Sequence, residues 1–403
     1  MSILSGKNIL LGVTAGIAAY KTTFLVRLFI KSGANVKVVM TPAAKEFVTP
    51  LTLSTLSKNE VHSTFTNQDD ENAVWNNHVE LGLWADIFLI APATANTLSK
   101  MATGNSDNLL LATYLSAKCP VYFAPAMDLD MYKHSSTKNT FATLQSFNNT
   151  MIPATSGELA SGLHGEGRMA EPQDIIGFIE KDILSKLPLK SKKVLLTAGP
   201  TFEAIDPVRF IGNRSTGKMG FEIAKALADK GAEVILVTGP THESVDHSLI
   251  TVIKVESAKQ MYTACHEHFS EVNAAILSSA VADYRPKTIA TQKIKKAGDT
   301  LTIELERTQD ILASLGKLKN QQILVGFALE TQNEIENAQG KLKRKNLDMI
   351  VLNSLNDKGA GFGGSTNKVT FIHANKEMQS FDLKSKAEVA NDIVYELTQY
   401  INA

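Results

Sequence analysis

The feature that most constrains the fold is an alternation of short apolar runs with helical segments. In the first half, NILLGV (8–13), VKVVM (36–40), IFLIAP (87–92) and VYFAP (121–125) read as strands with helical stretches between them. Strands that are apolar throughout and linked through helices are typical of a parallel sheet covered on both faces. We therefore predict an α/β fold whose first half is a doubly wound parallel sheet.

The second half starts the same pattern again. The strand-like VLLTAGP (194–200) is followed by the helical FEIAKALADKG (221–231) and then by the strand-like EVILVTGP (233–240). Further strand-like runs follow at AAILSSA, ILVGFAL and MIVLN. Because the loops after the first strands of the two halves differ in length, the halves are expected to bind different ligands.

The length of the chain also indicates two domains. Its 403 residues exceed the roughly 250–300 residues at which a single hydrophobic core stops growing. The helical stretch DIIGFIEKDILSKL runs into PLKSKK (188–193), whose proline and basic residues suit a short linker. We predict two tandem Rossmann-like domains, residues 1–189 and residues 190–403.

Charge and cysteine usage exclude several classes of partner. The chain has 41 Lys plus Arg and 41 Asp plus Glu, so no strong field attracts nucleic acid or an anionic membrane. No apolar stretch reaches the ~18 residues of a membrane span, and no signal-peptide pattern precedes the first strand. Cys119 and Cys265 are expected to be reduced thiols, and we expect a cytoplasmic protein.

The first strand leads directly into a glycine-containing turn and a helix, which is an arrangement suited to binding an anion. Gly12, Thr14 and Gly16 would line that site. The spacing differs from G-x-G-x-x-G, and the second strand ends in VVMT without the acidic residue that would hold an adenosine ribose. This favours a mononucleotide over NAD, although the glycines alone are equally compatible with a tight turn that binds nothing.

The segment GNRSTGKM (212–219) matches a phosphate-binding P-loop only superficially. The residue after Lys218 is Met219 instead of the Ser or Thr that ligates magnesium, and the segment does not follow its strand directly. What remains is a polar loop that leads into a helix and suits a phosphate. The alternative is a capped helix start with Ser215 or Thr216 as the cap.

Longer motifs make a resemblance specific. GVTAGIAAYK, NHVELGLWADIFLIAPATANTLSKMA, FAPAMDLDMY and GEGRM resemble the flavin-dependent decarboxylases that act on phosphopantothenoylcysteine. LTAGPTFEAIDPVRFIGNRSTGKMG, AVADYRPK, KIKK, VGFALET and KLKRKNLDMIVLN resemble phosphopantothenate–cysteine ligase. These motifs cover nearly the whole chain, which therefore resembles the bifunctional family of bacterial coenzyme A biosynthesis. The resemblance implies a flavodoxin-like first domain, and a Rossmann-like second domain with additions that make its sheet mixed.

For the first domain, the resemblance implies a site that binds FMN. The cofactor oxidises the substrate thiol, and the resulting thiocarbonyl accepts the electrons that the departing carbon dioxide leaves behind. His78 matches the histidine of the decarboxylation step; alone, it would more simply be a structural histidine at a helix start. The residues implied to contact FMN are Gly12, Thr14, Gly16, Thr41, Ala93, Thr94 and Asn96.

This sequence departs from the family pattern at two positions of the decarboxylase site. Asp128 stands where the family has an asparagine beside the substrate carboxylate, and Ser161 stands where it has a cysteine in a mobile, glycine-rich loop. A serine hydroxyl is too weak an acid to replace a thiol as proton donor. One hypothesis is that His164, Glu166 or a protonated Asp128 donates the proton instead.

For the second domain, the resemblance implies activation of phosphopantothenate by CTP as an acyl-cytidylate, with Mg²⁺ and cationic side chains stabilising the phosphate charge. Asn213 would handle the acyl-cytidylate. Alone, KLKRKN would read as a solvated basic helix. The implied nucleotide-binding residues are Leu277, Ser278, Ser279, Asp283, Lys293, Gln309, Asp310, Ile311, Leu312, Phe327, Lys341 and Lys345.

We therefore predict an enzyme that joins phosphopantothenate to L-cysteine and then decarboxylates the product, and the resemblance implies a homo-oligomer. A nicotinamide dehydrogenase is a rival, disfavoured because the ribose-binding acid is missing. A non-catalytic, flavoprotein-like regulatory module is a second rival, suggested by Asp128 and Ser161. An active ligase with an impaired or altered decarboxylase lies between these, and the preference between CTP and ATP stays open.

Overall fold

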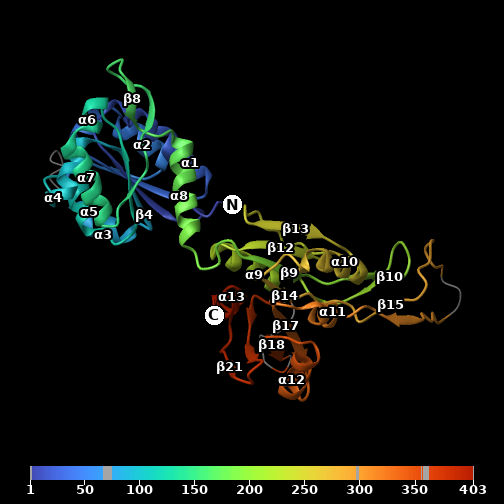
Figure 1. Cartoon of the computed structure of the whole chain (residues 1–403). Helices are drawn as coiled ribbons and strands as arrows, with labels where there is room; N and C mark the ends of the chain where they lie inside the picture. Colours follow the sequence, from blue (N-terminus) through green and yellow to red (C-terminus); the bar gives the residue numbers. More distant parts are fainter. Residues whose placement is uncertain (1, 67–74, 296–298, 355, 357–362, 403) are drawn as a thin grey trace. The chain divides into compact units, whose positions relative to one another are not determined.

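The chain forms two compact units, residues Met1–Leu184 and Ser185–Ala403. The computed structural model describes residues 2–66, 75–295, 299–354, 356 and 363–402 (Figure 1). The division falls within helix α8 (Pro172–Lys186), a few residues before the expected linker. None of the helices in the described part of the chain is long and apolar enough to span a membrane.

The first unit is built on a six-stranded sheet in the order β3-β2-β1-β4-β5-β6, and every neighbouring pair is parallel. The parallel sheet confirms the doubly wound, flavodoxin-like class. Its strand order is the one that also occurs in dinucleotide-binding sheets. The chain reverses direction across the sheet between β1 and β4, where ligands of such sheets bind. The strands are β1 (Asn8–Val13), β2 (Asn35–Met40), β3 (Val61–His62), β4 (Ile87–Ala93), β5 (Val121–Pro125) and β6 (Thr150–Met151).

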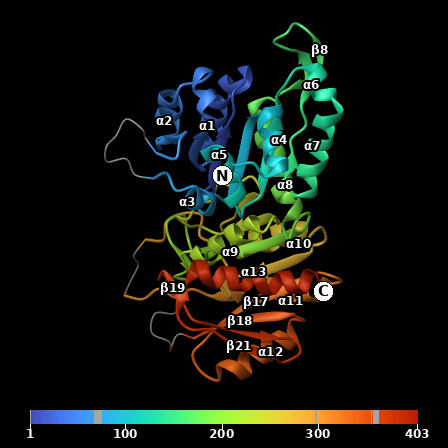
Figure 2. The same cartoon turned by 90° about the vertical axis from the view of Figure 1, so that its left-hand side faces the viewer.

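Helices cover both faces of this sheet, as the apolar strands require (Figure 2). Ile9 and Leu11 of β1 belong to the core on one face, whereas Leu10 belongs to the core on the other. A hairpin of β7 (Thr155–Glu158) and β8 (His164–Arg168) extends beyond the sheet. The helical segments before α8 are η1 (Ile17–Lys21), α1 (Thr22–Lys31), η2 (Pro42–Glu46), α2 (Pro50–Ser57), α3 (His78–Trp84), α4 (Ala95–Thr103), α5 (Leu109–Ser116), α6 (Leu129–Lys133) and α7 (Ser135–Ser146).

The second unit is built on an eight-stranded sheet in the order β13-β12-β9-β14-β17-β18-β20-β21. The strands from β13 to β18 are parallel, and β20 and β21 extend the sheet with antiparallel pairing. This confirms the mixed sheet. The strands are β9 (Lys193–Ala198), β12 (Glu233–Thr238), β13 (Ile250–Lys254), β14 (Ala274–Leu277), β17 (Ile323–Glu330), β18 (Met349–Ser354), β20 (Val369–His373) and β21 (Met378–Ser380).

Two separate cores flank the second sheet. Helices α9 and α13 contribute to one core, and α10, α11 and α12 contribute to the other. Ser257 and Gln260 form a capping box at the start of α10, which satisfies the free N–H groups of its first turn. The helices are α9 (Lys218–Asp229), α10 (Ala258–Phe269), α11 (Ile311–Leu318), α12 (Glu334–Arg344) and α13 (Lys386–Asn402).

Three short antiparallel pairs complete the second unit. The pairs are β10 (Phe202–Ala204) with β11 (Phe210–Gly212), β15 (Tyr284–Pro286) with β16 (Leu305–Arg307), and β19 (Thr366–Asn367) with β22 (Lys384–Ser385). The pairs β10–β11 and β15–β16 lie close together beyond the carboxyl ends of the parallel strands (Figure 1).

Candidate active sites

A cavity of about 1000 Å³ lies at the point where the first sheet reverses its strand order. Its walls come from the segments that follow β1, β2, β4 and β5, and from the β7–β8 hairpin. Among the expected residues, the lining includes Gly16, Thr41, Thr94, Asn96 and Asp128. The structure thus brings together side chains that are far apart in the sequence, at the edge of the sheet where parallel strands end.

The turns after β1 and β4 are joined through Thr14. Its buried hydroxyl donates to the Pro92 carbonyl at 2.7 Å and accepts from the Thr94 N–H at 3.2 Å. Gly12 lies in β1, where a Cβ would stand 3.0 Å from the Phe88 ring. Gly12 therefore serves close packing of β1 on its neighbours, and Thr14 orders the turn that forms the cavity floor. Ala93 is buried in β4.

The cavity has polar groups that a flavin could engage. The Thr41 hydroxyl is buried without a hydrogen-bond partner among the described residues. Thr94 precedes α4 without a side-chain cap, so N–H groups of the first turn of α4 have no side-chain partner. A ligand with phosphate and ring carbonyl groups would satisfy such donors. The residues present therefore fit the flavin that the sequence implies.

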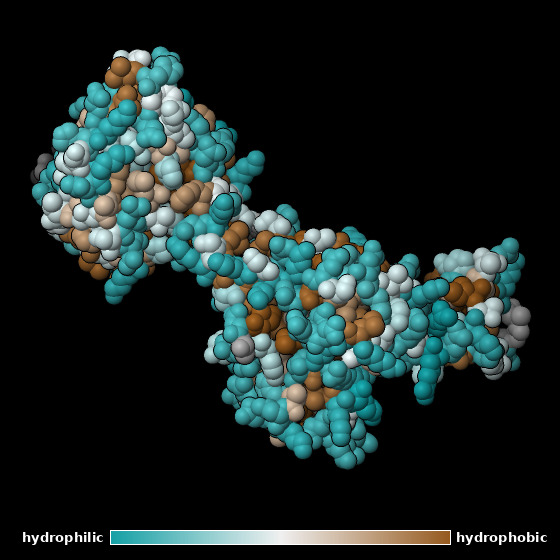
Figure 3. Space-filling model, viewed as in Figure 1, coloured by the Kyte–Doolittle hydropathy of each residue, from teal (hydrophilic) through white to brown (hydrophobic). Residues whose placement is uncertain are grey.

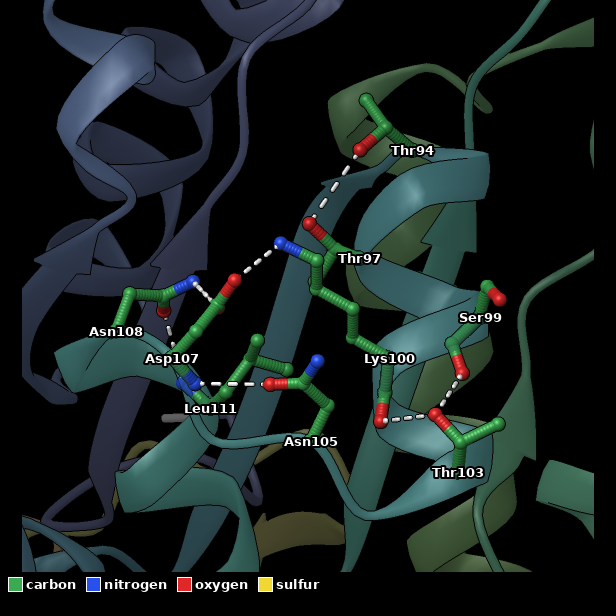
Figure 4. A network of polar contacts seen from close by, with 9 residues as sticks. All are labelled: Thr94, Thr97, Ser99, Lys100, Thr103, Asn105, Asp107, Asn108 and Leu111. Carbon is green, nitrogen blue, oxygen red and sulfur yellow. Dashed lines mark hydrogen bonds and ion pairs between the residues drawn. The ribbon is translucent and has the colours of Figure 1, made fainter.

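Two ion-pair networks place cations at the cavity. Figure 4 shows Lys100 of α4 reaching Asp107, whose other oxygen accepts from Asn108 at 2.9 Å. On another wall, the buried Lys21 donates to the Met169 carbonyl at 3.0 Å and to Glu171 at 2.9 Å.

Glu171 also accepts from Arg168 at 2.9 Å. The hydrogen bond from Lys21 lowers the pKa of Glu171, against an opposing effect of burial. The sequence interpretation did not single out Lys21, Lys100 or Arg168, although each lies in or near a recognised motif.

Asp128 is both a cavity residue and the N-cap of α6. Its Oδ1 accepts from the Leu129 N–H at 2.6 Å. Met127 and Met131 line the cavity beside it. In the described part of the chain, Asp128 makes no ion pair, whereas Lys21, Lys100 and Arg168 are each paired with another carboxylate. The lining of this cavity therefore holds a carboxylate that forms no ion pair with a cation of the described residues.

His78 lies outside the lining of its own chain's cavity. It is the first residue of α3, which Asn77 caps by accepting from the Val79 N–H at 3.0 Å. Its ring meets Phe65 edge-on at 6.0 Å, and its buried Nδ1 has no partner among the described residues. The structure therefore does not bring His78 together with the other residues that the resemblance implied for the first cavity.

Ser161 lies at the exposed end of the β7–β8 hairpin. Its Oγ accepts from the Leu163 N–H at 3.4 Å, and the neighbouring Leu159 and Ala160 line the cavity. His164 and Glu166 belong to β8 but not to the lining. The roles of Ser161, His164 and Glu166 stay predictions.

A second cavity, of about 490 Å³, lies at the carboxyl ends of β14 and β17 in the second unit. Thr197, Tyr284, Arg307 and Thr308 also line this cavity. They were not predicted, although Thr197 and Tyr284 lie within the motifs LTAGPTFEAIDPVRFIGNRSTGKMG and AVADYRPK, because a motif does not show which of its residues face a cavity. The expected residues that line the cavity are Leu277, Ser279, Asp283, Gln309, Asp310, Ile311, Leu312, Phe327, Lys341 and Lys345.

Two lysines, Lys341 and Lys345, contribute positive charge to the lining of this cavity. Lys341 Nζ donates to the Phe327 carbonyl at 2.8 Å, and Lys345 Nζ stands 2.6 Å from Asp310. Burial lowers the pKa of Lys341, and the nearby Lys345 lowers it further. Burial raises the pKa of Asp310, but the hydrogen bond with Lys345 and that from the Ala313 N–H lower it overall. An anion entering the cavity would relieve the repulsion between the two lysines.

The remaining expected residues of the second unit differ in their placement. Ser279 Oγ is buried without a partner among the described residues, whereas Ser278 Oγ donates to the Thr197 carbonyl at 2.6 Å. Asn213 lies beside the cavity, because its amide donates to the carbonyls of Ala280 and Val281 at 3.0 and 3.2 Å. Lys293 is exposed and outside the lining. The described residues contain no cluster of three His, Cys, Asp or Glu side chains suited to a metal ion.

Two family models match the chain, one for each unit. Residues 2–184 match the flavoprotein model, and residues 189–401 match the DNA/pantothenate metabolism flavoprotein C-terminal domain. The first half is thus a flavoprotein domain, which does not support the nicotinamide dehydrogenase considered above.

Individual proteins match over most of their length. A "Cysteine/Cysteine sulfinic acid decarboxylase" from an unknown prokaryotic organism is 53% identical over 88% of this chain and 100% of its own. The "Coenzyme A biosynthesis bifunctional protein CoaBC" of Bacillus subtilis (strain 168) is 42% identical over 98% of this chain and 97% of its own. A crystal structure of the C-terminal domain of such a bifunctional protein is 41% identical, covers 54% of this chain and 99% of that chain, and has a TM-score of 0.47.

Proposed function

We propose that the two cavities catalyse consecutive reactions, because this chain belongs to the pantothenate-metabolism flavoprotein family, which includes the bifunctional proteins of coenzyme A biosynthesis. The second unit joins 4'-phosphopantothenate to L-cysteine, and the first unit decarboxylates the product to 4'-phosphopantetheine. The observation that carries the proposal is the cavity of the second unit, which gathers Lys341, Lys345 and Ser279 from separate motifs.

In the ligase reaction, the substrate carboxylate attacks the α-phosphorus of CTP, and pyrophosphate leaves. The cysteine amine then attacks the acyl carbon, and cytidine monophosphate leaves. Lys341 and Lys345 would stabilise the negative charge on the phosphates, and Asn213 would hold the acyl-cytidylate. Mg²⁺ would be held largely by the phosphates, as is usual for this ion in nucleotide sites. The unpartnered Ser279 hydroxyl supports recognition of the base by hydrogen bonding.

In the decarboxylase reaction, we propose that FMN occupies the cavity of the first unit. FMN supplies reversible oxidation of the substrate thiol, which creates the electron sink for loss of carbon dioxide. Thr14 and Thr94 shape the cofactor site, Thr41 and Asn96 offer hydrogen bonds to it, and Asp128 faces the substrate end. The β7–β8 hairpin that carries Ser161 would exclude water from the reacting groups.

We further propose a homo-oligomer. His78 would act in the cavity of a second copy, since it lies outside the cavity of its own. In the second unit, Val208, Phe210 and Ile289 are exposed on or near the hairpins β10–β11 and β15–β16, a region that Figure 3 shows as partly apolar. Such residues suit a contact with another copy. Intracellular supply of CTP and the free thiols of Cys119 and Cys265 support a cytoplasmic location.

The test is to incubate the purified chain with phosphopantothenate, cysteine, Mg²⁺ and CTP, with ATP in parallel, and to identify the products by mass spectrometry. We expect phosphopantetheine. Phosphopantothenoylcysteine alone would indicate an active ligase with an impaired decarboxylase, or a regulatory flavoprotein unit. Accumulation of the unsaturated enethiol would show that the reductive step fails without a thiol at position 161. If neither phosphopantothenoylcysteine nor phosphopantetheine forms, the proposal is contradicted.

A second candidate for the first unit is decarboxylation of free cysteine or cysteine sulfinic acid. It is favoured by the 53% identical relative of that name and by the unneutralised carboxylate of Asp128. In phosphopantothenoylcysteine, the nitrogen of the cysteine moiety is part of an amide, and the molecule carries several negative charges. In a free amino acid, the same nitrogen is an ammonium group, which a carboxylate attracts. Incubation with each free amino acid and analysis for released carbon dioxide and the corresponding amine decides between the substrates.

A further inference from the structure

The turn between β10 and β11 is hydrogen-bonded to a segment that is distant in the sequence. This segment, residues 290–295, contains Lys293 and is here called the lysine segment. Its first contact is a hydrogen bond from the Ala290 N–H to the Ile205 carbonyl at 3.0 Å. The next contacts are made by Asp206 and Arg209, here called the clasp.

Asp206 is the buried half of the clasp, with a side chain fully removed from solvent. Its Oδ1 accepts from the N–H groups of Val208 and Arg209, both at 2.9 Å, which closes the turn. Its Oδ2 accepts from Arg209 Nε at 3.0 Å and from the Ile294 N–H at 3.1 Å. The hydrogen bond from the Arg209 guanidinium, with the backbone donors, holds the pKa of Asp206 far below its ordinary value. The carboxylate therefore stays ionised at any physiological pH.

Arg209 binds the same segment through the carbonyl of Ile294. One of its terminal nitrogens contacts Asp206 and also donates to the Ile294 carbonyl at 2.9 Å. Both polar groups of Ile294, its N–H and its carbonyl, are thus bonded to the clasp. This arrangement needs the planar, multiple-donor guanidinium, because a lysine ammonium cannot supply the same fixed fork.

We propose that Asp206 and Arg209 are positioning residues that hold the lysine segment so that Lys293 can meet the phosphates of the bound nucleotide. The proposal rests on the ligase function proposed above and on the nucleotide-binding role that the family resemblance implies for Lys293. Lys293 is exposed and lies next to the gripped Ile294. A lysine on an unrestrained loop would lose more conformational freedom on binding than one whose backbone is already fixed.

The test measures the affinity of the full chain for CTP with Mg²⁺ by calorimetry, and separately its affinity for phosphopantothenate. The variants are Arg209→Lys, Lys293→Ala and the combination of both. The control is Lys319→Gln, which removes a partly buried ion pair with Asp348 of 2.7 Å elsewhere in the same unit. Arg209 is 42% exposed, so the conservative change to lysine is expected to leave the unit folded.

We expect Arg209→Lys and Lys293→Ala each to raise the Kd for CTP about tenfold, and the double variant to be no weaker than Lys293→Ala alone, because one effect acts through the other. The Kd for phosphopantothenate should stay unchanged, as should both affinities of the control. Additive effects, an unchanged CTP affinity in Arg209→Lys, or equal weakening of both ligands would overturn the clasp. An unchanged CTP affinity in Lys293→Ala would instead overturn the proposed role of Lys293, and the clasp with it.

Discussion

At the scale of single residues, Asp128 places a carboxylate in the lining of the first cavity, and we propose that this carboxylate affects which substrate binds there. The cations around the first cavity are bound by Asp107 and Glu171, so they leave the charge of Asp128 uncompensated. The side chain also caps α6, a role that asparagine fulfils equally well. Charge and capping can therefore be separated by one substitution.

We predict that Asp128→Asn raises kcat/KM for phosphopantothenoylcysteine about tenfold relative to that for free cysteine, since one unit charge near the substrate is worth on the order of 1–2 kcal/mol. The melting temperature should change little. Rates of carbon dioxide release with both substrates provide the measurement. Asp130→Asn, on the same helix but outside the cavity lining, is the matched control. An unchanged substrate ratio would remove Asp128 from the specificity argument.

Residue identity could be predicted from the sequence better than residue placement. The resemblance implied that the backbone of Leu277, Ser278 and Ser279 lies near the base. Of the two serines, Ser279 lines the cavity, whereas the Ser278 hydroxyl donates to the Thr197 carbonyl. Which of two adjacent serines faces a cavity depends on partners from other strands, which a motif does not contain. Lys21 and Lys100 were not predicted for a related reason, because their ion pairs with Glu171 and Asp107 form only when the chain folds.

At the scale of elements, the strands and most helices followed from apolar runs and turn residues, because the burial of a parallel sheet leaves a clear pattern. The short hairpins β10–β11 and β15–β16 were not expected as separate elements. Each has only three residues per strand, which is too short for a periodic signal. Contacts between elements then decide how well the cavity walls are held.

The contact between α11 and α12 gives a prediction about stability. A Cβ on Gly316 would stand 2.0 Å from the Lys345 carbonyl oxygen, whereas one on Gly340 would have open space up to 4.0 Å. Gly340→Ala should therefore stabilise the unit by about 0.5–1 kcal/mol through helix propensity. Gly316→Ala gains the same propensity but must separate the two segments, at a cost of about 1–3 kcal/mol.

Thermal unfolding of these two glycine variants, with CTP binding for each, provides the measurement. We expect Gly316→Ala to lower the melting temperature and to weaken CTP binding, because Lys345 would move. A rise in melting temperature for both variants would show that the close approach of α11 to Lys345 is relaxed in solution.

The link between η1 and the start of α8 gives a prediction about pH. The folded pKa of Glu171 is lowered by Lys21, so its carboxylate contributes stability above its unfolded pKa of about 4.3, and that contribution is lost as the pH falls through the folded value. Because Glu171 is 44% exposed, we expect about 1 kcal/mol or less.

Urea unfolding at pH 7 and at successively lower pH checks this expectation. The stability difference between the wild type and Glu171→Gln should be largest at pH 7 and should shrink below about pH 4.3. Glu46→Gln, a change at an exposed residue of η2, serves as the control. A difference that grows as the medium becomes more acidic would contradict the ion pair.

At the scale of the whole molecule, each unit has cores on both faces of its own sheet. We therefore predict that residues 1–184 and residues 185–403 fold separately when expressed as two chains. The second fragment should form phosphopantothenoylcysteine, and the first should bind flavin, with its absorbance as the measurement. Loss of cooperative unfolding in either fragment would show that the units depend on each other for stability.

The edges of the eight-stranded sheet have a consequence for solubility. Its last strand, β21, has three exposed residues and offers few free backbone groups to another chain. Removing β20 and β21 would uncover β18, whose first four residues are buried and apolar. β18 would then be an apolar edge strand with unpaired backbone groups, and such strands favour pairing with other chains and aggregation. In the folded unit, the small antiparallel extension thus covers an apolar sheet edge that would otherwise favour aggregation.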